Sequence, residues 1–199
     1  MLRRWNLFRS KISLRTPPMS DPKRVLCLLA PGFEEIDTVA PIDLLRRAGA
    51  EVVVASLHGE DLVTGRSNLT VKADLPLAEV KTETFDLLII PGGPGVQGMR
   101  ADGRPAQLAK AFIEAQKRVA AICAGPTVLG DAGLLQGRRF TAHFSVHGEL
   151  PGALADKVVR DGQVITSRGA GTAVDFGLAL VEELFGADKA AEIAAAIMV

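Results

Sequence analysis

The sequence predicts a doubly wound α/β fold, in which helices cover both faces of a mostly parallel β-sheet. Short, continuous apolar runs occupy residues 24–30, 50–57, 85–91 and 118–122. Such runs are typical of strands that are covered on both faces. Segments with helical periodicity separate the runs, and strands that alternate with helices indicate a parallel sheet.

The length and composition of the chain fit one domain with a sizeable core. The chain has 199 residues, of which 48% are hydrophobic, and we assign residues 23–199 to a single domain. No apolar run reaches the length of a membrane span. Two cysteines, Cys27 and Cys123, are too few for a disulfide framework and favour a reducing compartment. We therefore expect a cytoplasmic location.

The charge distribution and the aromatic content argue against a nucleic-acid partner. Seven of the 23 basic residues and one of the 23 acidic residues fall in residues 1–24, so the rest of the chain carries a net charge of −6. This mildly acidic body lacks tyrosine and offers neither a basic face nor a base-stacking surface. We expect no specific nucleic-acid binding and no membrane partner.

Residues 1–22 differ from the body of the chain. They are rich in arginine, nearly free of acidic residues, and end in a proline-rich stretch. The segment lacks the long apolar centre of a secretory signal. We expect a disordered extension, or a start codon placed too early with Met19 as the first residue. An organelle presequence is the alternative.

The first half of the body places a helix, a hairpin and a glycine-rich loop between its strands. Three acidic side chains open a helix over residues 34–48, because acids favour a helix start. Residues 62–74 alternate as a hairpin does. The glycine-rich loop 92–95 follows the third apolar run, and its spacing fits neither a Walker loop nor a dinucleotide fingerprint.

The second half of the body continues the alternation of helices and strands. The patterns predict an amphipathic helix at residues 107–117, a helix at 126–135, a short strand at 139–143, a hairpin at 157–166, a glycine-rich link at 167–172, and helices at 173–185 and 187–198. No repeat or linker interrupts this order, which supports a single domain.

Cys123 is the candidate nucleophile. It ends a buried strand, and Pro126 lies in the first turn of the helix that follows. Unpaired N–H groups and the positive end of the helix dipole at such a position favour the thiolate, which is the reactive form. From this stretch alone, a buried cysteine that only fills space is the alternative.

Four strand ends are expected to meet at the carboxyl edge of the sheet. They are residues 32–37, 92–95 and 123–125, and His143. Sites in this architecture lie at that edge, which favours the nucleophile over the space-filling cysteine. His147 follows His143 at a metal-ligand spacing, but no HExxH motif or third ligand accompanies the pair. We expect neither a metal nor another cofactor.

Five sequence features together resemble a known family. PGFEEID, IIPGG, AAICAGP, His143 and TSRGAGT occur in this order, and they resemble the ThiJ/PfpI superfamily, above all its DJ-one and YajL branch. The resemblance covers residues 24 to about 197. It implies a flavodoxin-like fold, a homodimer and a reactive cysteine at Cys123.

The resemblance also implies roles for the residues around this cysteine. Gly92, Gly93 and Ala124 fall on the family's oxyanion-binding backbone, and His143 matches its nearby histidine. Glu35 belongs to the matching acidic pair, and we expect it to contact the substrate.

The sequence departs from the family pattern at four positions. The acid that shares a proton with the thiol is glutamate in the family and Asp37 here, one methylene shorter, which leaves the thiol pKa open. Ala124 stands where the protease-like members have histidine, so we do not expect a Cys–His peptidase. Gly65 stands where some relatives carry a second cysteine, and Ala170 replaces the usual proline.

The branch is similar to cofactor-free glyoxalases of the glyoxalase III type and to protein deglycases. It implies an enzyme that acts on methylglyoxal or glyoxal, or on their adducts with proteins. Cys123 attacks the aldehyde, Asp37 moves protons as a general acid or base, and His143 assists or lines the pocket. The alternative is a redox-sensing or chaperone-like stress protein that acts through oxidation of Cys123.

Overall fold

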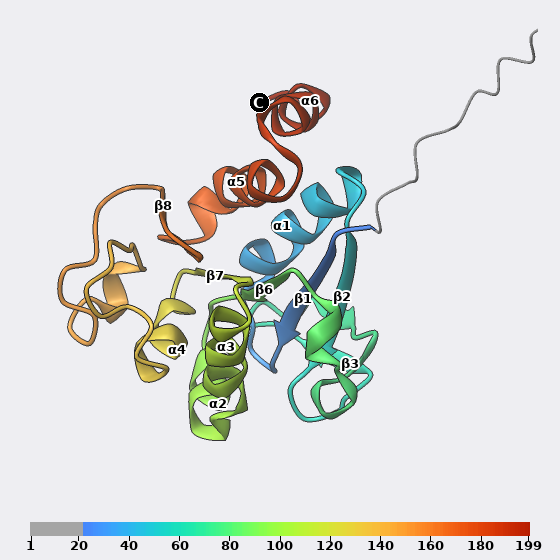
Figure 1. Cartoon of the computed structure of the whole chain (residues 1–199). Helices are drawn as coiled ribbons and strands as arrows, with labels where there is room; N and C mark the ends of the chain where they lie inside the picture. Colours follow the sequence, from blue (N-terminus) through green and yellow to red (C-terminus); the bar gives the residue numbers. More distant parts are fainter. Residues whose placement is uncertain (1–21) are drawn as a thin grey trace, which may run out of the picture.

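A seven-stranded sheet forms the centre of the computed structural model, which describes residues 22–199 (Figure 1). The strands, in spatial order, are β5 (Leu75–Pro76), β2 (Glu51–Ser56), β1 (Arg24–Leu29), β6 (Leu87–Ile90), β7 (Arg118–Ile122), β9 (Val164–Ser167) and β8 (Val158–Asp161). Neighbouring strands are parallel except β8 and β9, which are antiparallel. This arrangement confirms the predicted doubly wound, flavodoxin-like α/β fold. The extension or presequence expected at residues 1–22 lies outside the described residues, except for residue 22.

Helices cover both faces of the sheet, as predicted (Figure 1). One side holds α1 (Glu35–Arg47), α5 (Ala173–Phe185) and α6 (Ala187–Ala196), and the other holds α2 (Val96–Asp102), α3 (Arg104–Glu114) and α4 (Pro126–Asp131). β1 serves both cores, because alternate side chains of a strand point to opposite faces. Cys27 and Leu29 join the α1 side, whereas Leu26 and Leu28 join the α2 side. Cys27 is therefore a core residue.

Short elements complete the described part of the chain. They are the antiparallel pair β3 (Leu62–Thr64) and β4 (Thr70–Lys72), and the 3-10 turns η1 (Leu77–Glu79), η2 (Thr82–Thr84), η3 (Phe144–Val146) and η4 (Ala170–Thr172). The hairpins predicted at residues 62–74 and 157–166 are confirmed. Within residues 22–199, no helix is long and apolar enough to cross a bilayer.

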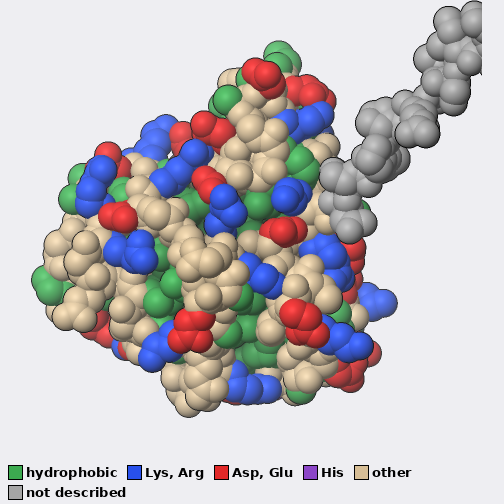
Figure 2. Space-filling view, viewed as in Figure 1, with side chains coloured by type: hydrophobic (Ala, Val, Ile, Leu, Met, Phe, Trp, Pro, Cys, Tyr) green, Lys and Arg blue, Asp and Glu red, His purple; other side chains and the backbone are tan. Residues whose placement is uncertain are grey.

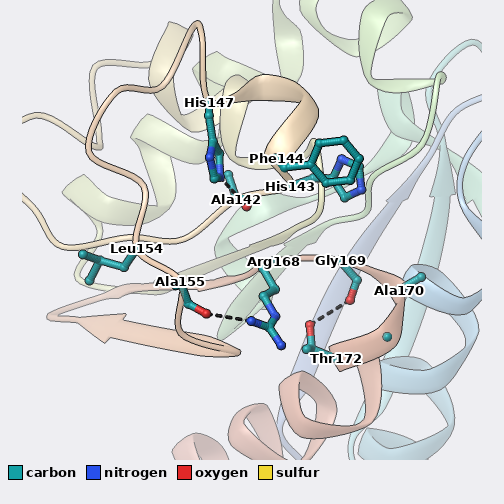
Figure 3. Close-up of a pocket in the computed structure, with 11 residues that line it drawn as sticks. Ala142, His143, Phe144, His147, Leu154, Ala155, Arg168, Gly169, Ala170 and Thr172 are labelled. Atoms are coloured by element: carbon teal, nitrogen blue, oxygen red, sulfur yellow. Dashed lines mark hydrogen bonds between the residues drawn. The ribbon is translucent and has the colours of Figure 1, made fainter.

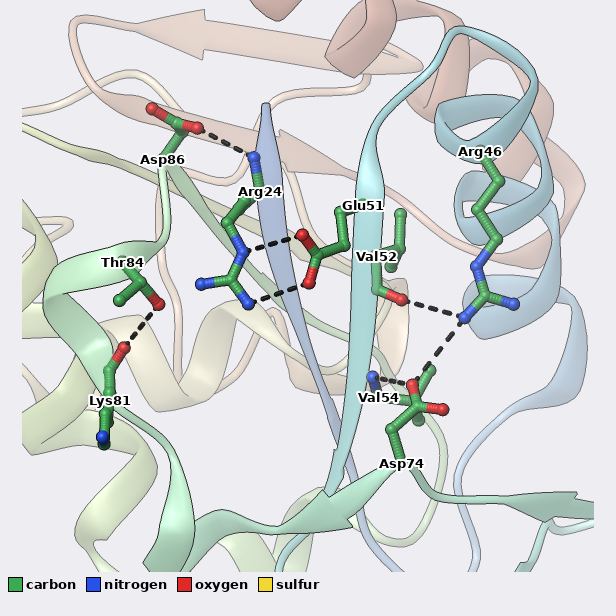
Figure 4. Close-up of polar contacts among 9 residues, drawn as sticks. All are labelled: Arg24, Arg46, Glu51, Val52, Val54, Asp74, Lys81, Thr84 and Asp86. Atoms are coloured by element: carbon green, nitrogen blue, oxygen red, sulfur yellow. Dashed lines mark hydrogen bonds and ion pairs between the residues drawn. The ribbon is translucent and has the colours of Figure 1, made fainter. Parts of the chain in front are cut away.

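Polar contacts tie together the edge of the sheet at which β1 and β2 begin (Figure 4). The Arg24 guanidinium donates to both carboxylate oxygens of Glu51, at 2.9 and 3.0 Å, and the Arg24 backbone N–H donates to Asp86. Exposed ion pairs of this kind contribute about 0–1 kcal/mol. They support the strand register at the edge opposite to the one at which Cys123 lies.

Charged side chains of both signs are interspersed over the face of the molecule seen in Figure 2. The visible face shows no continuous basic stripe of the kind that tracks a phosphate backbone.

The prediction of a strand at residues 139–143 is wrong. Only Thr141 forms an isolated bridge there, to Leu154. Backbone N–H groups of this segment donate to side chains rather than to the carbonyl groups of a neighbouring strand. The Thr141 N–H donates to the Thr166 hydroxyl at 2.9 Å, and the Arg139 N–H donates to the Asp161 carboxylate. The segment nevertheless reaches the same sheet edge.

One additional helix and two helix boundaries also differ from the sequence-based expectation. α2 was not predicted, because its seven residues are too few to show a clear period. α3 begins three residues earlier than expected, where Pro105 occupies its first turn. α4 ends at Asp131 rather than at residue 135, because Gly133 follows with a left-handed φ of +71°.

We expect two glycine substitutions to change stability in opposite directions. A Cβ at Gly177 in α5 would lie 2.6 Å from Leu44 Cδ1 and 3.1 Å from Pro41 Cα of α1, whereas a Cβ at Gly98 in α2 would meet nothing within 4 Å. Alanine gains about 1 kcal/mol over glycine in a helix, so Gly98→Ala should stabilise. Overpacking costs about 1–3 kcal/mol, so Gly177→Ala should destabilise. Urea unfolding measures both, and an equal gain would contradict the close packing of α1 on α5.

Candidate active site

The backbone of Cys123 is held in a strained conformation at the end of β7. Its φ is +63°, a left-handed value that costs about 1–2 kcal/mol for a residue with a Cβ. Two hydrogen bonds fix it there. The Cys123 N–H donates to the Ser167 carbonyl at 2.9 Å, and the His143 N–H donates to the Cys123 carbonyl at 2.8 Å. Strain that is held from two neighbouring segments is typical of functional positions.

Cys123 lines a cavity of about 340 Å³ at the carboxyl edge of the sheet. The other lining residues are Arg66, Gly93, Pro94, Val96, Gln97, Ala124, Thr127, His143, Ser145, Val146 and Glu149. The cavity therefore brings together four residues that the sequence singled out, namely Gly93, Cys123, Ala124 and His143. Gly92, Asp37 and Glu35 do not line it.

Gly92 separates Cys123 from Asp37 and leaves just enough room for both. A Cβ at this position would lie 2.5 Å from Cys123 Cβ and 2.6 Å from Asp37 Oδ2. Any other residue would push the carboxyl group away from the cysteine. The Gly92 N–H faces the Asp37 carboxyl group and lowers its pKa, and the oxyanion-binding role of Gly92 stays a prediction.

Asp37 is completely buried in the first turn of α1. Burial, followed by the charge of Glu34, raises the pKa of Asp37 to about 7. The Cys123 thiol, the Gly92 N–H and the Arg66 charge act in the opposite direction. Neither carboxyl oxygen has a hydrogen bond of normal length and angle, so burial remains the dominant influence on this group.

The thiol of Cys123 holds its proton more tightly than a free cysteine. Burial and the charge of Asp37 raise its pKa to about 12, and the N–H groups of Gly93 and Ala124 offset only part of the rise. The expectation that the helix start favours the thiolate is therefore wrong for the resting site, because burial outweighs the short helix. At neutral pH the Cys123 thiol therefore keeps its proton, and the Asp37 carboxyl group beside it is partly ionised.

The N–H groups of Gly93 and Ala124 face the sulfur atom of Cys123. They come from two different loops, one after β6 and one after β7. Donors fixed in advance at the place where negative charge develops are the elements of an oxyanion hole. Their position supports the role that the resemblance implies for these two residues.

His143 stands between this cavity and a second one. Its Nδ1 accepts from the Ser145 N–H at 3.3 Å and lies 2.8 Å from the Ser145 hydroxyl. This partner assigns the proton of the neutral ring to Nε2. The ring centroid lies 4.2 Å from that of Phe144, which is largely exposed. The histidine is thus fixed as a donor at the cavity wall.

The second cavity measures about 550 Å³ and shares His143 with the first. Figure 3 shows Arg168 below the two histidines, with its side chain held by the Ala155 carbonyl at 2.7 Å. His147 is tied to the Ala142 carbonyl at 3.1 Å. Within residues 22–199, no group of three His, Cys, Asp or Glu side chains is arranged to hold a metal ion.

Glu35 anchors the β3–β4 hairpin. Its Oε1 accepts from the Ser67 N–H at 2.6 Å, and a Cβ at Gly65 would lie 2.5 Å from the same oxygen. Burial acts to raise the pKa of Glu35, but hydrogen bonds from Ser67 and from other hairpin backbone groups outweigh it and lower the pKa. The contacts of Glu35 in this structure are therefore structural, and the substrate contact expected for it stays a prediction.

Arg66 is a charged lining residue that sequence reasoning missed. Its backbone N–H donates to the Phe33 carbonyl at 2.9 Å, which holds the hairpin tip over the cavity. The signal was present in the sequence, because the hairpin follows β2 at the carboxyl edge of the sheet.

Comparisons with known proteins point to one family. The model of the DJ-1/PfpI family matches residues 23–183. Protein dj-1beta of Drosophila melanogaster is 40% identical over 185 residues, which cover 89% of this chain and 97% of that protein. The glutathione-independent glyoxalase DJR-1.2 of Caenorhabditis elegans is 38% identical over 176 residues, covering 86% and 94%. The solved structure of oxidized Toxoplasma gondii DJ-1 superposes with a TM-score of 0.84 at 38% identity, covering 88% and 98%.

We expect Asp37→Asn to remove a pH dependence of the free energy of unfolding. Folding raises the pKa of Asp37 from 3.8 to about 7. The folded state binds this proton more tightly than the unfolded state, so the resulting stability is fully present below a pH of about 4 and is lost as the pH rises through about 7. A tenfold change in proton affinity is worth about 1.4 kcal/mol, so the loss is on the order of 4 kcal/mol.

Urea unfolding between about pH 4 and pH 8 measures this difference. Asp156→Asn is the matched control, because Asp156 is exposed and should leave the slope of the wild type unchanged. Equal slopes in the wild type and Asp37→Asn would show that Asp37 does not titrate in this window.

Proposed function

The chain belongs to the DJ-1/PfpI family, and we propose that it is a cofactor-independent enzyme of the glyoxalase III or deglycase type. Its substrates are methylglyoxal or glyoxal and their adducts with proteins. The observation that carries the proposal is the pairing of Cys123 with Asp37 beneath a cavity that also holds two backbone donors. A relative at 38% identity is named a glutathione-independent glyoxalase, which supports the same class.

The first step is attack of Cys123 on the aldehyde carbon. The thiol proton passes to Asp37, whose pKa of about 7 lets it accept and return a proton near neutral pH. The sulfur atom forms a bond to the carbon, and the carbonyl electrons move to oxygen. The N–H groups of Gly93 and Ala124 stabilise this oxyanion, which is then protonated to the hemithioacetal.

The second step moves a proton between the two carbons of the former dicarbonyl. Asp37 removes the proton from the carbon bonded to sulfur, which gives an enediol, and a proton returns to the neighbouring carbon. The product is the thioester of a 2-hydroxy acid on Cys123. Water then cleaves the thioester, releasing lactate from methylglyoxal and restoring the thiol. His143 lies at the wall with an Nε2–H that can donate to a substrate oxygen.

Lactate formation from methylglyoxal by the full chain tests the proposal. Cys123→Ser should lose about a thousandfold or more in kcat/KM, because the hydroxyl is a far weaker nucleophile. Asp37→Asn should lose about a hundredfold, because the general acid–base is gone. Cys27→Ala is the matched thiol control and should keep activity, since Cys27 is buried in β1.

If the wild-type protein formed no lactate from methylglyoxal, the enzyme proposal would be contradicted. A second candidate, a redox-sensing protein, would then lead if peroxide oxidised Cys123 readily. Two peroxide molecules would convert the thiolate to a sulfinate with release of water. The N–H groups of Gly93 and Ala124 would face that anion, and a relative at 38% identity has been solved in an oxidized form.

A second copy of the chain is the partner that we propose for the α1 face. Ile36 and Val39 of α1 are 54% and 49% exposed, and Leu69 beside them on the hairpin is 61% exposed. Exposed apolar side chains grouped in this way mark interaction sites. Sedimentation should give the mass of a dimer, and a monomer at micromolar concentration would contradict it.

Both cysteines are free, which supports the cytoplasmic location we propose.

A further inference from the structure

Arg66 is the one positively charged Lys or Arg side chain among the described residues that line the Cys123 cavity. No carboxylate of residues 22–199 lies within 4.0 Å of its guanidinium. The one acidic residue in the lining, Glu149, is paired with Arg100 at 2.7 Å. The cavity therefore presents a free positive charge.

The hairpin holds Arg66 at the rim in a defined place. Its N–H is bonded to Phe33, and the next residue, Ser67, is bonded to the buried carboxylate of Glu35. The Gly32 N–H also donates to the Thr64 carbonyl at 2.8 Å. The charge of Arg66 reaches the reacting pair, because it lowers the pKa of Asp37.

We propose that Arg66 selects small electrophilic carbonyl compounds that carry a carboxylate. A guanidinium binds a carboxylate through two parallel N–H donors, and the attraction is strongest where water is partly excluded. A cavity of about 340 Å³ has room for a five-carbon oxoaldehyde whose carboxylate meets Arg66 while its aldehyde meets Cys123. The preferred substrate class is then a 2-oxoaldehyde with a distal carboxylate.

The conversion of such a substrate rests on the proposed function, and its atoms balance. For 4,5-dioxopentanoate, the aldehyde carbon gains the water oxygen and becomes a carboxylate, and the ketone carbon gains a hydrogen and becomes an alcohol. The product is 2-hydroxyglutarate. Methylglyoxal lacks the carboxylate and is bound without the help of Arg66.

The selection can be measured without any turnover, by alkylation of Cys123. The thiolate displaces iodide from iodoacetate or iodoacetamide, forming an S–C bond while the C–I bond breaks. The two reagents differ in charge and little in size. In the wild type, Arg66→Gln, Arg66→Lys and Lys72→Gln, mass spectrometry follows the rate at Cys123, and buried Cys27 is the internal reference.

Arg66→Gln should lower the ratio of the iodoacetate rate to the iodoacetamide rate by about fivefold, the effect of one unit charge at several Å in a partly solvated cavity. A change in the pKa of Asp37 affects both reagents equally and cancels in the ratio. Arg66→Lys should keep most of the ratio. Lys72→Gln removes the same charge from the same hairpin outside the cavity and should leave the ratio unchanged. A ratio equal in the wild type and Arg66→Gln would overturn the proposal.

Turnover tests the substrate class separately. The value of kcat/KM for 4,5-dioxopentanoate should fall about fivefold or more in Arg66→Gln, while that for methylglyoxal should change less than about twofold. Equal losses for both substrates would overturn the assigned substrate class. If the wild type converts neither compound, the proposed function and the substrate class fail together, and the alkylation ratio still decides whether Arg66 selects anions.

Discussion

The contact between a buried carboxyl group and a buried thiol is the constraint on which the rest of the site depends. Burial raises the pKa of Asp37 to about 7 and that of Cys123 to about 12. Because folding raises the pKa of Asp37 from 3.8 to about 7, ionisation of this carboxyl group weakens the folded state as the pH rises towards neutral. Gly92 makes the approach sterically feasible, because a Cβ would fall 2.5 Å from Cys123 Cβ. Burial of Asp37 beside Cys123 therefore costs folding stability, and it places a group that can exchange a proton next to the candidate nucleophile.

The fold holds this costly pair in place through backbone contacts from several elements. The side chain of Glu34 caps the Asp37 N–H at 2.7 Å, and α1 is packed tightly against Gly177 of α5. Pro41 has no N–H, so the helix ladder cannot supply a donor to the carbonyl of Asp37, four residues earlier. The cap by Glu34 and the packing of α1 on α5 therefore help to position Asp37 where this helix hydrogen bond is missing.

The sequence was sufficient to predict the strand–helix alternation and the residues at its carboxyl edge, because apolar runs and turn glycines are local signals. Cys123, Gly93, Ala124 and His143 were placed in one site for this reason. The hairpin contact of Glu35 was not predicted, because the sequence does not distinguish a carboxylate that binds substrate from one that accepts a hydrogen bond from hairpin backbone. Arg66 was missed because its position depends on how the hairpin folds over the edge, which is a tertiary contact.

The shorter acid at position 37 bears on the choice between the two functions. Where the resemblance expects glutamate, the carboxyl oxygens of Asp37 have no hydrogen bond of normal geometry. Burial is the main cause of the raised pKa of the resting Cys123 thiol, and the charge of Asp37 adds to it. Peroxide oxidises the thiolate, and a sensor needs that form at rest. An enzyme needs only that the proton leave during attack on a bound carbonyl, which Asp37 can accept. This difference is our reason for proposing catalysis rather than sensing as the first candidate function.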